Sequence, residues 1–183
     1  VQGVLEEKGV RGIRIDRDER HLQTEIAGLE WRPEFVDAEV LERAIQGVAE
    51  SARAAAYGQY QRDARDTATP AGMSSFLLRL AQGKVLSPAS TKFVLAAMAE
   101  CRTFPDRLKA RVAPGWGLAH KTGTSGSWKG VTAATNDVGI LTAPDGGRLA
   151  IAVFVGDSRA SEEARAAVMA KISAAAIAAY GRE

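Results

Sequence analysis

The sequence predicts an α+β fold in which helices pack on an antiparallel sheet of three strands. Apolar residues recur at helical spacing across residues 37–112, and the pattern changes to strand-like apolar runs across 116–156. An alanine-rich helical stretch follows over 161–181. Helices before and after a block of antiparallel strands are typical of folds in which helices cover such a sheet. Of the 183 residues, 46% are hydrophobic and 25% charged, which is enough apolar material for a globular core.

Capping residues mark the helices in order. The chain opens with what looks like the last turns of a helix that Gly9 ends, followed by an irregular, charged segment over 10–36. Asp37 can cap the next helix, and Thr69-Pro70 and Ser87-Pro88 open two more. The expected inward faces of these three helices carry Val40, Leu41, Ile45 and Val48; then Phe76, Leu77, Leu80 and Ala81; then Phe93, Val94, Ala97 and Met98. A short amphipathic segment over 105–112 leads to the sheet.

Three strands are expected, over 118–124, 131–143 and 149–156. Pro144-Asp-Gly-Gly147 joins the last two as a tight hairpin, which makes them antiparallel neighbours. Ser161, followed by two glutamates, then caps the terminal helix over 164–180.

Composition and charge exclude several functions. The net charge is only +2, with no block of Lys and Arg, so we expect no nucleic-acid partner. No apolar run approaches the roughly 20 residues that span a bilayer, so we expect no membrane-spanning segment. Cys101 is the only cysteine, which rules out an intrachain disulfide and a cysteine-based metal site. We expect it to be a small buried hydrophobe, and we expect neither a metal nor an organic cofactor.

The segment His-Lys-Thr-Gly-Thr-Ser-Gly at 120–126 carries the strongest chemical signal. Lys121 supplies an ammonium, Thr122 a hydroxyl donor, and Gly123 leaves space where a substrate can lie against the strand. Lys-Thr-Gly on a strand is one of the short motifs of penicillin-recognising serine enzymes. Two further segments follow in a fixed order: Thr-Ala-Ala-Thr-Asn-Asp-Val-Gly-Ile at 132–140 and, after the hairpin, Ala-Val-Phe-Val at 152–155.

Together these segments resemble the C-terminal part of a class A β-lactamase, of the extended-spectrum branch, from about Arg14 to Tyr180. Arg14-x-Asp-Arg-x-Glu19-x-x-Leu-Gln23 matches the omega-loop pattern of that family, with Gln23 where an Asn is usual. The resemblance implies that Glu19 is the general base that activates the deacylating water, and that the Gln23 amide helps to hold it. The alternative is a solvated glutamate in an exposed loop.

The resemblance also implies an organisation in which residues 1–183 form the C-terminal portion of a single domain. Residues 10–69 would be an extended omega loop with an inserted helix, because residues 24–64 are longer than the corresponding stretch of the family. Residues 70–112 would be helices, 116–156 the antiparallel strands and 161–181 the terminal helix. A salt bridge between Arg17 and Asp66 would close the neck of the loop.

Further substrate contacts follow from the same resemblance. Thr124 would offer a backbone donor to the substrate carbonyl oxygen, and Thr124 and Ser125 hydroxyl contacts to its carboxylate. Arg107 lies fourteen residues before Lys121 and is the candidate anchor for that carboxylate, with an ordinary surface arginine as the alternative. His120 is expected to pack or lie on the strand surface, and His21 to be exposed.

The nucleophile of the family is not found: the 183 residues contain no Ser-x-x-Lys and no Ser-Asp-Asn. Both motifs precede the omega loop in the family, so we expect them upstream, and we expect this chain alone to be inactive. The resemblance implies a periplasmic or secreted enzyme that acts on a β-lactam. Two alternatives stay open: a penicillin-binding peptidase or esterase, and a non-catalytic fragment or binding module. The apolar strand over 149–155 also predicts a homodimer or pairing with the missing N-terminal segment.

Overall fold

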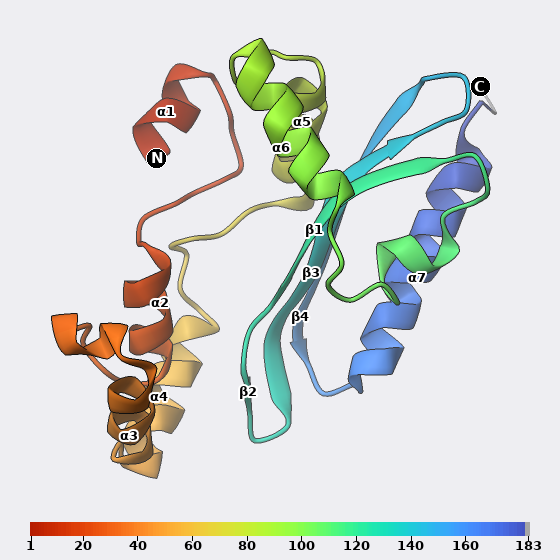
Figure 1. The fold of residues 1–183 in the computed structure, drawn as a ribbon. Helices are drawn as coiled ribbons and strands as arrows, with labels where there is room; N and C mark the ends of the chain where they lie inside the picture. The colour runs from red at the N-terminus through yellow and green to blue at the C-terminus, as the bar shows by residue number, and fades with distance from the viewer. Residues whose placement is uncertain (182–183) are drawn as a thin grey trace. The chain divides into compact units, whose positions relative to one another are not determined.

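The computed structural model describes residues 1–181, and its contacts divide the chain into two compact units. The first unit comprises Arg14–Thr67 together with Val1–Gln2. The second comprises Gly3–Ile13 and the chain from Ala68 onward. Figure 1 labels the elements of both.

The first unit is helical: α2 (Glu19–Ile26), the 3-10 helix η1 (Pro33–Val36), α3 (Ala38–Gln46) and α4 (Glu50–Tyr60). Asp37 caps α3 as predicted, because its carboxylate accepts from the amides of the first turn. The expectation of an irregular segment over 10–36 is wrong. Asp18 caps α2 by accepting from the His21 amide, and Glu19 adds a negative charge to the first turn. Most side chains of α2 are polar or charged, and Thr24 is its one buried residue. The helix therefore has little apolar periodicity for a sequence pattern to reveal.

Phe35 and Tyr57 are the buried hydrophobic residues of this unit, at 5% and 6% exposure. Helix α2 packs on α4, and α3 packs on η1. No residue of α3 is fully buried although its apolar residues share one face. Burial in this unit is therefore shallow, and its charged network, described below, contributes to holding it together.

The second unit is built on an antiparallel sheet of β1 (Gly117–Thr124), β3 (Val131–Thr142) and β4 (Arg148–Ser158). The short strand β2 (Ser127–Trp128) also pairs with β3. Lys121 pairs with Val138 and Thr124 with Thr135. The three long strands and the hairpin at 144–147 confirm the predicted α+β class. β3 lies in the middle, so β1 and β4 occupy its two sides.

Helices cover both faces of this sheet (Figure 1). α5 (Pro70–Ala81) packs on β3 and β4, and α6 (Pro88–Ala99) packs on β1. The terminal helix α7 (Glu162–Ala179) packs on β4 and on the 3-10 helix η2 (Leu108–Arg111). Thr69, Ser87 and Ser161 cap α5, α6 and α7 through their hydroxyls, as predicted. Near the N-terminus α1 (Gln2–Glu7) ends before Gly9, whose φ is +64°.

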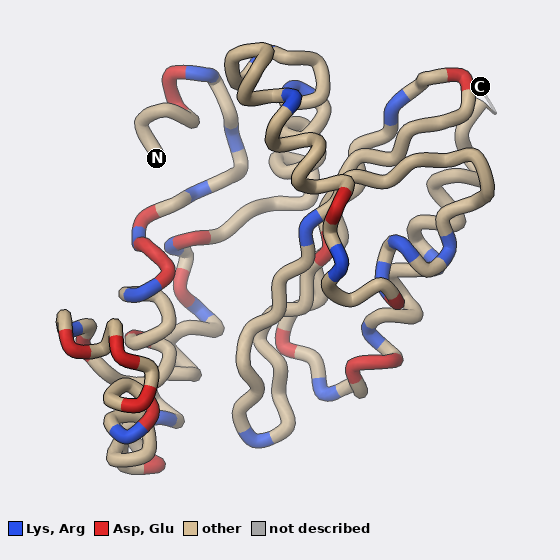
Figure 2. The backbone as a smooth tube through the Cα atoms, in the orientation of Figure 1, with Lys and Arg blue, Asp and Glu red and all other residues tan. Residues whose placement is uncertain are grey.

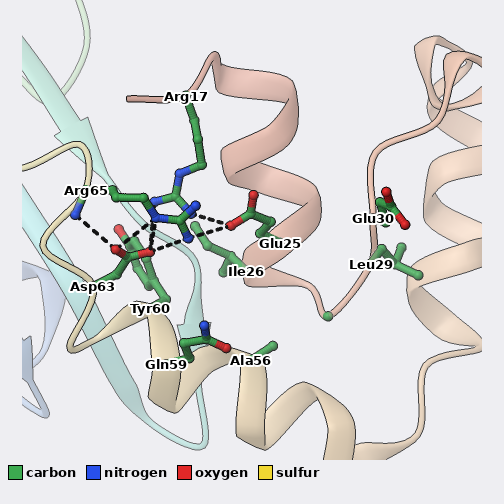
Figure 3. Close-up of a pocket in the computed structure, with 11 residues that line it drawn as sticks. Arg17, Glu25, Ile26, Leu29, Glu30, Ala56, Gln59, Tyr60, Asp63 and Arg65 are labelled. Atoms are coloured by element: carbon green, nitrogen blue, oxygen red, sulfur yellow. Dashed lines mark hydrogen bonds and ion pairs between the residues drawn. The ribbon is translucent and has the colours of Figure 1, made fainter. Parts of the chain in front are cut away.

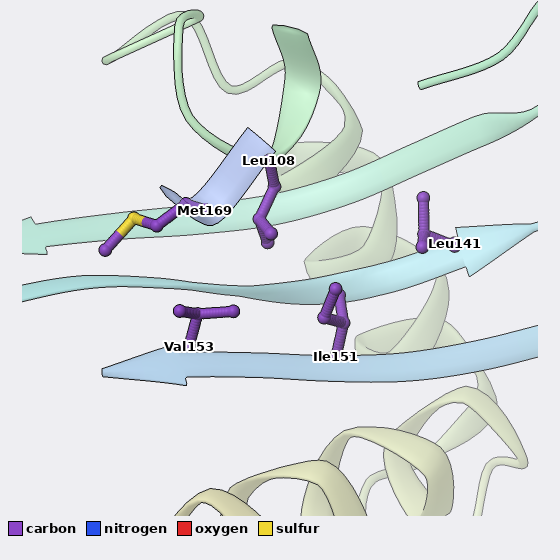
Figure 4. Packing of buried hydrophobic residues seen from close by; sticks show 5 residues of the cluster. All are labelled: Leu108, Leu141, Ile151, Val153 and Met169. Atoms are coloured by element: carbon purple, nitrogen blue, oxygen red, sulfur yellow. The ribbon is translucent and has the colours of Figure 1, made fainter. Parts of the chain in front are cut away.

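The two faces of the sheet carry separate cores because neighbouring residues of a strand point to opposite sides. Leu141 belongs to a cluster with Leu108, Ile151, Val153 and Met169 (Figure 4). Its neighbour Ile140 packs on the other face with α5 residues Leu77 and Ala81. A sheet covered on both faces accounts for the continuous apolar runs in β3 and β4.

Two burial predictions are wrong. Phe93 is 74% exposed and lies outside the inward face of α6, where Thr91 is buried and Leu95 packs on the core together with Met98, which was predicted to face inward. Cys101 is half-buried rather than buried, with its Sγ 3.4 Å from the Thr103 hydroxyl. Both residues lie on or just after α6, an almost uniformly apolar helix in which periodicity cannot choose a face.

Candidate functional site

The Lys-Thr-Gly segment lies on β1, at a side of the sheet where the described residues supply no further strand. Strand alternation separates its first two side chains. Lys121 is exposed, and its Nζ donates to the Thr122 carbonyl at 2.6 Å. Thr122 is 6% exposed and its hydroxyl lies 2.5 Å from that of Thr103. The Lys121 ammonium and the Thr122 hydroxyl therefore lie on opposite faces of β1.

Gly123 follows on the exposed side, and the fold does not demand a glycine there. A Cβ at this position would meet only the Cβ of Asn136, at 4.0 Å, which is an ordinary contact. Its φ is not in the left-handed region. Packing within the chain therefore does not explain Gly123, and the surface it leaves bare agrees with the expectation of a substrate against the strand.

Arg107 is completely buried, which overturns the surface alternative. It immediately precedes η2 and reaches the end of β1: Nη2 donates to the Thr124 hydroxyl at 2.7 Å, and Nη1 to the carbonyls of Gly123 and Asn136 at 3.3 and 3.0 Å. Its guanidinium also lies 3.8 Å from the ring centre of Phe104. Burial lowers the pKa of Arg107 below its ordinary value, and the Asp137 carboxylate opposes that effect. Arg107 has no exposed surface in this structure, and its expected role as the carboxylate anchor stays a prediction.

A buried carboxylate accompanies this arginine. Asp137, on β3, is 0% exposed; its Oδ1 lies 2.9 Å from His120 Nδ1 and its Oδ2 accepts from the Leu108 amide at 3.2 Å. His120 is 1% exposed, so it packs inside rather than on the strand surface. Sequence reasoning missed Asp137, although an aspartate inside an apolar strand is unusual enough to be a signal.

The hydroxyls of Ser125 and Thr124 differ in how many hydrogen bonds they make within the chain. The Ser125 hydroxyl accepts from the Ala134 amide at 2.9 Å and donates to the Gly126 carbonyl at 3.0 Å, so both of its roles serve the strand end. Thr124 is exposed, and its oxygen accepts from Arg107. Of the two hydroxyls predicted to meet the substrate, that of Thr124 is therefore the better placed.

In the first unit, Glu19 and Gln23 lie one turn apart on α2. The Gln23 amide donates to Glu19 Oε1 at 2.7 Å, and both side chains are exposed. A carboxylate and an amide in contact at the start of a helix form a pair that can bind a water between them and a reacting group. His21, on the same helix, is exposed as predicted, with Nδ1 2.9 Å from Asp18.

Arg17 and Asp66 form an ion pair that closes the loop, with Nε 2.7 Å from Oδ2. The Asp66 Oδ1 also accepts from the backbone amides of Asp16 and Arg17 at 2.6 and 2.9 Å. Asp66 adopts a left-handed φ of +53°, a conformation that aspartate tolerates better than most residues. Burial raises the pKa of Asp66, but these hydrogen bonds and the guanidinium outweigh it and lower the pKa overall.

The ion pair extends into a network of both signs. Arg17 also contacts Glu25 at 2.5 Å and Asp63 at 3.2 Å, and Arg65 bridges the same two carboxylates at 2.9 and 2.7 Å. Figure 2 shows acidic and basic residues following one another where this unit begins and ends. Hydrogen bonding to Arg65 lowers the pKa of Asp63 from 3.8 to about 2. The network borders an open cavity of about 370 Å³ between α2 and α4 (Figure 3).

Glu19, Gln23, Arg17 and Asp66 thus belong to the first unit, and the Lys121 strand with Arg107 belongs to the second. Within residues 1–181, no group of three or more histidine, cysteine, aspartate or glutamate side chains is arranged to hold a metal ion. In the same range, each helix is too short or too polar to cross a membrane.

Comparison with known proteins gives consistent matches. The family described as "Beta-lactamase enzyme family" matches residues 1–180. The chain is 43% identical over 102 residues to the extended-spectrum β-lactamase PER-1 and 38% identical over 117 residues to β-lactamase VEB-1, both of Pseudomonas aeruginosa. These alignments cover 56% and 63% of this chain but only 33% and 38% of the relatives.

Solved structures extend the likeness to nearly the whole chain. A β-lactamase from Chitinophaga pinensis shares 31% identity with a TM-score of 0.66, covering 94% of this chain and 51% of the other. The TLA-1 extended-spectrum β-lactamase shares 28% identity with a TM-score of 0.66, covering 93% and 50%. The chain therefore spans about a third of the length of the curated relatives and about half of these structures.

Proposed function

Because the chain belongs to the β-lactamase enzyme family, we propose that the complete protein hydrolyses β-lactams through a serine acyl-enzyme, as in class A β-lactamases. The observation that carries the proposal is β1: it places Lys121 and the bare surface of Gly123 at an unpaired side of the sheet. There an extended, anionic acyl substrate can lie against the backbone while the ammonium attracts its negative charge.

The nucleophilic serine of this mechanism lies outside the 183 residues, since they contain no Ser-x-x-Lys. The serine oxygen would attack the lactam carbonyl and form an ester as the C–N bond of the ring breaks, and the proton of the serine hydroxyl would pass to the ring nitrogen. Backbone amides at the end of β1, at Thr124, would donate to the carbonyl oxygen as charge develops on it.

Glu19 would then drive the second step. Its carboxylate would take a proton from a water while that water attacks the ester, and the proton would then return to the serine oxygen as the C–O bond breaks and the product leaves. The hydrogen bond from Gln23 fixes the Glu19 side chain and leaves its second oxygen for the water. A penicillin-binding peptidase or esterase shares the Lys-Thr-Gly strand but lacks this glutamate, so the pair favours the β-lactamase.

The deciding experiment uses Glu19→Ala in the complete protein with a chromogenic cephalosporin. We expect deacylation to slow by roughly 100- to 10,000-fold while acylation is largely kept, so that mass spectrometry detects an acyl-enzyme. The 183-residue chain alone, which has no nucleophile, is the negative control. A Glu19→Ala variant that turns over like its parent would remove Glu19 from the mechanism, and a parent that never hydrolyses a β-lactam would overturn the function.

We also propose that the outer side of β4 accepts a further strand. Ile151 and Val153 of β4 are buried, yet among residues 1–181 the strand pairs with β3 alone. An apolar strand with an unpaired edge recruits another strand. In the complete protein that strand would come from residues outside this chain, and in the isolated chain from a second copy. Light scattering of the isolated chain tests this, because a stable monomer at micromolar concentration would contradict it.

By the same family resemblance we propose that the protein is periplasmic or secreted. Cell fractionation after expression of the complete gene tests this, and activity confined to the cytoplasm would contradict it.

A further inference from the structure

We propose that the cavity between α2 and α4 binds a small amphipathic ammonium compound that also carries an amide carbonyl, as the N-terminal end of a short apolar peptide does. The residues that line the cavity all lie between positions 17 and 65, within the first unit, and do not include Glu19 or Gln23. Most of them fall in residues 24–64, the stretch that is longer than in the family. The cavity is therefore separate from the residues to which we assign the chemical steps of β-lactam hydrolysis.

The two ends of the cavity differ in chemistry (Figure 3). Arg17, Glu25, Asp63 and Arg65 gather at one end, and Glu30 lies at the other. Apolar side chains also line the cavity, namely those of Ile26, Leu29 and Ala56. Its volume of about 370 Å³ falls within the range of roughly 300–1,000 Å³ that is usual for small-molecule sites. The cavity therefore suits a ligand of dipeptide size with an apolar body and polar ends.

At the first end, Arg17 has a hydrogen-bond donor that the chain leaves unused. The side chain is 8% exposed; Nε donates to Asp66 and Nη1 to Glu25. Nη2 is buried and makes no hydrogen bond among the described residues, although it lies 3.2 Å from Asp63 Oδ2 in an ion pair. A buried donor without an acceptor is costly, and buried polar groups of native proteins nearly always have a partner. An acceptor inside the cavity would satisfy Nη2.

The charges around Nη2 favour a neutral acceptor. Contacts of 2.5 to 3.2 Å join the two guanidinium groups of this end to three carboxylates, those of Glu25, Asp63 and Asp66. Because the carboxylates outnumber the guanidinium groups, a ligand carboxylate would meet an excess of negative charge. An amide carbonyl accepts the same hydrogen bond without adding charge.

At the other end, Glu30 offers a carboxylate that the chain does not use. It is exposed, and no hydrogen bond or ion pair joins it to another described residue. A carboxylate with free oxygens forms its strongest hydrogen bonds with a charged donor, such as an ammonium group. We therefore assign the ligand carbonyl to Arg17, the ammonium to Glu30 and the apolar body to the side chains that line the cavity.

Titration calorimetry of the complete protein with leucyl-leucinamide tests the assignment of the ligand groups. We expect binding in the millimolar range or tighter. N-acetyl-leucyl-leucinamide, which has no ammonium, should bind about 10- to 100-fold more weakly, because it loses a hydrogen bond between charged groups. Leucyl-leucine, which ends in a carboxylate, should also bind more weakly. Absence of binding by leucyl-leucinamide, equal binding of the three compounds, or tighter binding of leucyl-leucine would overturn the inference.

Two variants with the same change of charge test the role of Glu30. Glu30→Gln should weaken the binding of leucyl-leucinamide by about tenfold or more. Glu42→Gln is the matched control, because Glu42 is an exposed glutamate on α3 that does not line the cavity, and it should leave the affinity unchanged. Neither variant should change the turnover of a β-lactam. An equal loss of affinity in the two variants would show an unspecific effect of net charge and would overturn the inference.

Hydrogen exchange and a crystal structure locate the ligand without relying on activity. At a ligand concentration ten times Kd, amide exchange in α2 and α4 should slow by about tenfold, while exchange in β1 and β3 should not change. In crystals soaked with leucyl-leucinamide, we expect a carbonyl oxygen within hydrogen-bond distance of Arg17 Nη2. Slowing confined to β1, or an ordered water alone at Nη2, would overturn the inference and leave the proposed function intact.

Discussion

Replacement of Asp66 by asparagine, glycine or alanine separates the stability that its carboxylate contributes through hydrogen bonds and charge from the cost of its left-handed backbone conformation. The carboxylate accepts from two backbone amides and from the Arg17 guanidinium, and the residue holds a left-handed φ of +53°. Asparagine keeps an acceptor for the amides and tolerates this φ, but it loses the charge. Glycine tolerates the φ and loses every bond. Alanine loses both the bonds and the tolerance.

The expected costs follow from these differences. Loss of the charge alone should destabilise the first unit by about 1–3 kcal/mol in Asp66→Asn, because Arg17 is 8% exposed and keeps Glu25 and Asp63 as partners. Asp66→Gly should cost about 3 kcal/mol or more, since two backbone amides then lose their acceptor. Asp66→Ala should cost a further 1–2 kcal/mol for a left-handed residue with a Cβ.

Amide hydrogen exchange measures the loss of local stability in each variant, residue by residue. Protection across residues 14–67 should fall in the order parent, asparagine, glycine, alanine. Protection of β3 and β4 should stay at the parental level, because these strands belong to the second unit and have their own core. Equal protection in the glycine and alanine variants would refute the conformational contribution. Equal protection in the asparagine and alanine variants would refute the contribution of the hydrogen bonds.

Three further predictions follow from individual residues. The pKa of Asp63 is depressed from 3.8 to about 2, so its contribution to stability is complete above about pH 4 and is lost as the pH falls toward 2. Urea titrations should show the difference in free energy of unfolding between the parent and Asp63→Asn narrowing over that range. A difference that does not depend on pH would contradict the pairing with Arg65. Thr135→Val removes a buried hydroxyl that has no hydrogen-bond partner among the described residues. The free energy of unfolding should therefore stay level or rise by about 1–3 kcal/mol. A clearly lower melting temperature would show that the hydroxyl makes a hydrogen bond. Gly123→Ala should leave the melting temperature nearly unchanged but reduce turnover by the complete protein. Gly139→Ala should lower the melting temperature, because its Cβ would lie 2.6 Å from the Ala119 carbonyl oxygen. A lower melting temperature for Gly123→Ala, with turnover kept, would show that Gly123 serves the fold.

Much of the fold could be predicted from the sequence because its signals are local. The caps at Thr69, Ser87 and Ser161 place helix starts through hydrogen bonds from amides three residues further along the chain. The hairpin at 144–147 sets the register of β3 and β4 through its own short turn. Helix α2 was missed because its face is mostly charged, and the inward side of α6 because nearly every residue there is apolar.

The sequence by itself determined which chemical groups are present: the Lys121 strand, the Glu19 loop and the family to which they belong. Only the tertiary structure decided what Arg107 does, because its contacts with Thr124 and Asn136 join residues 17 and 29 positions apart. The same holds for Asp137, whose burial against His120 and Leu108 no local pattern records. A cap or a turn is satisfied by its own neighbours, whereas a buried charge is satisfied by whatever the fold brings to it.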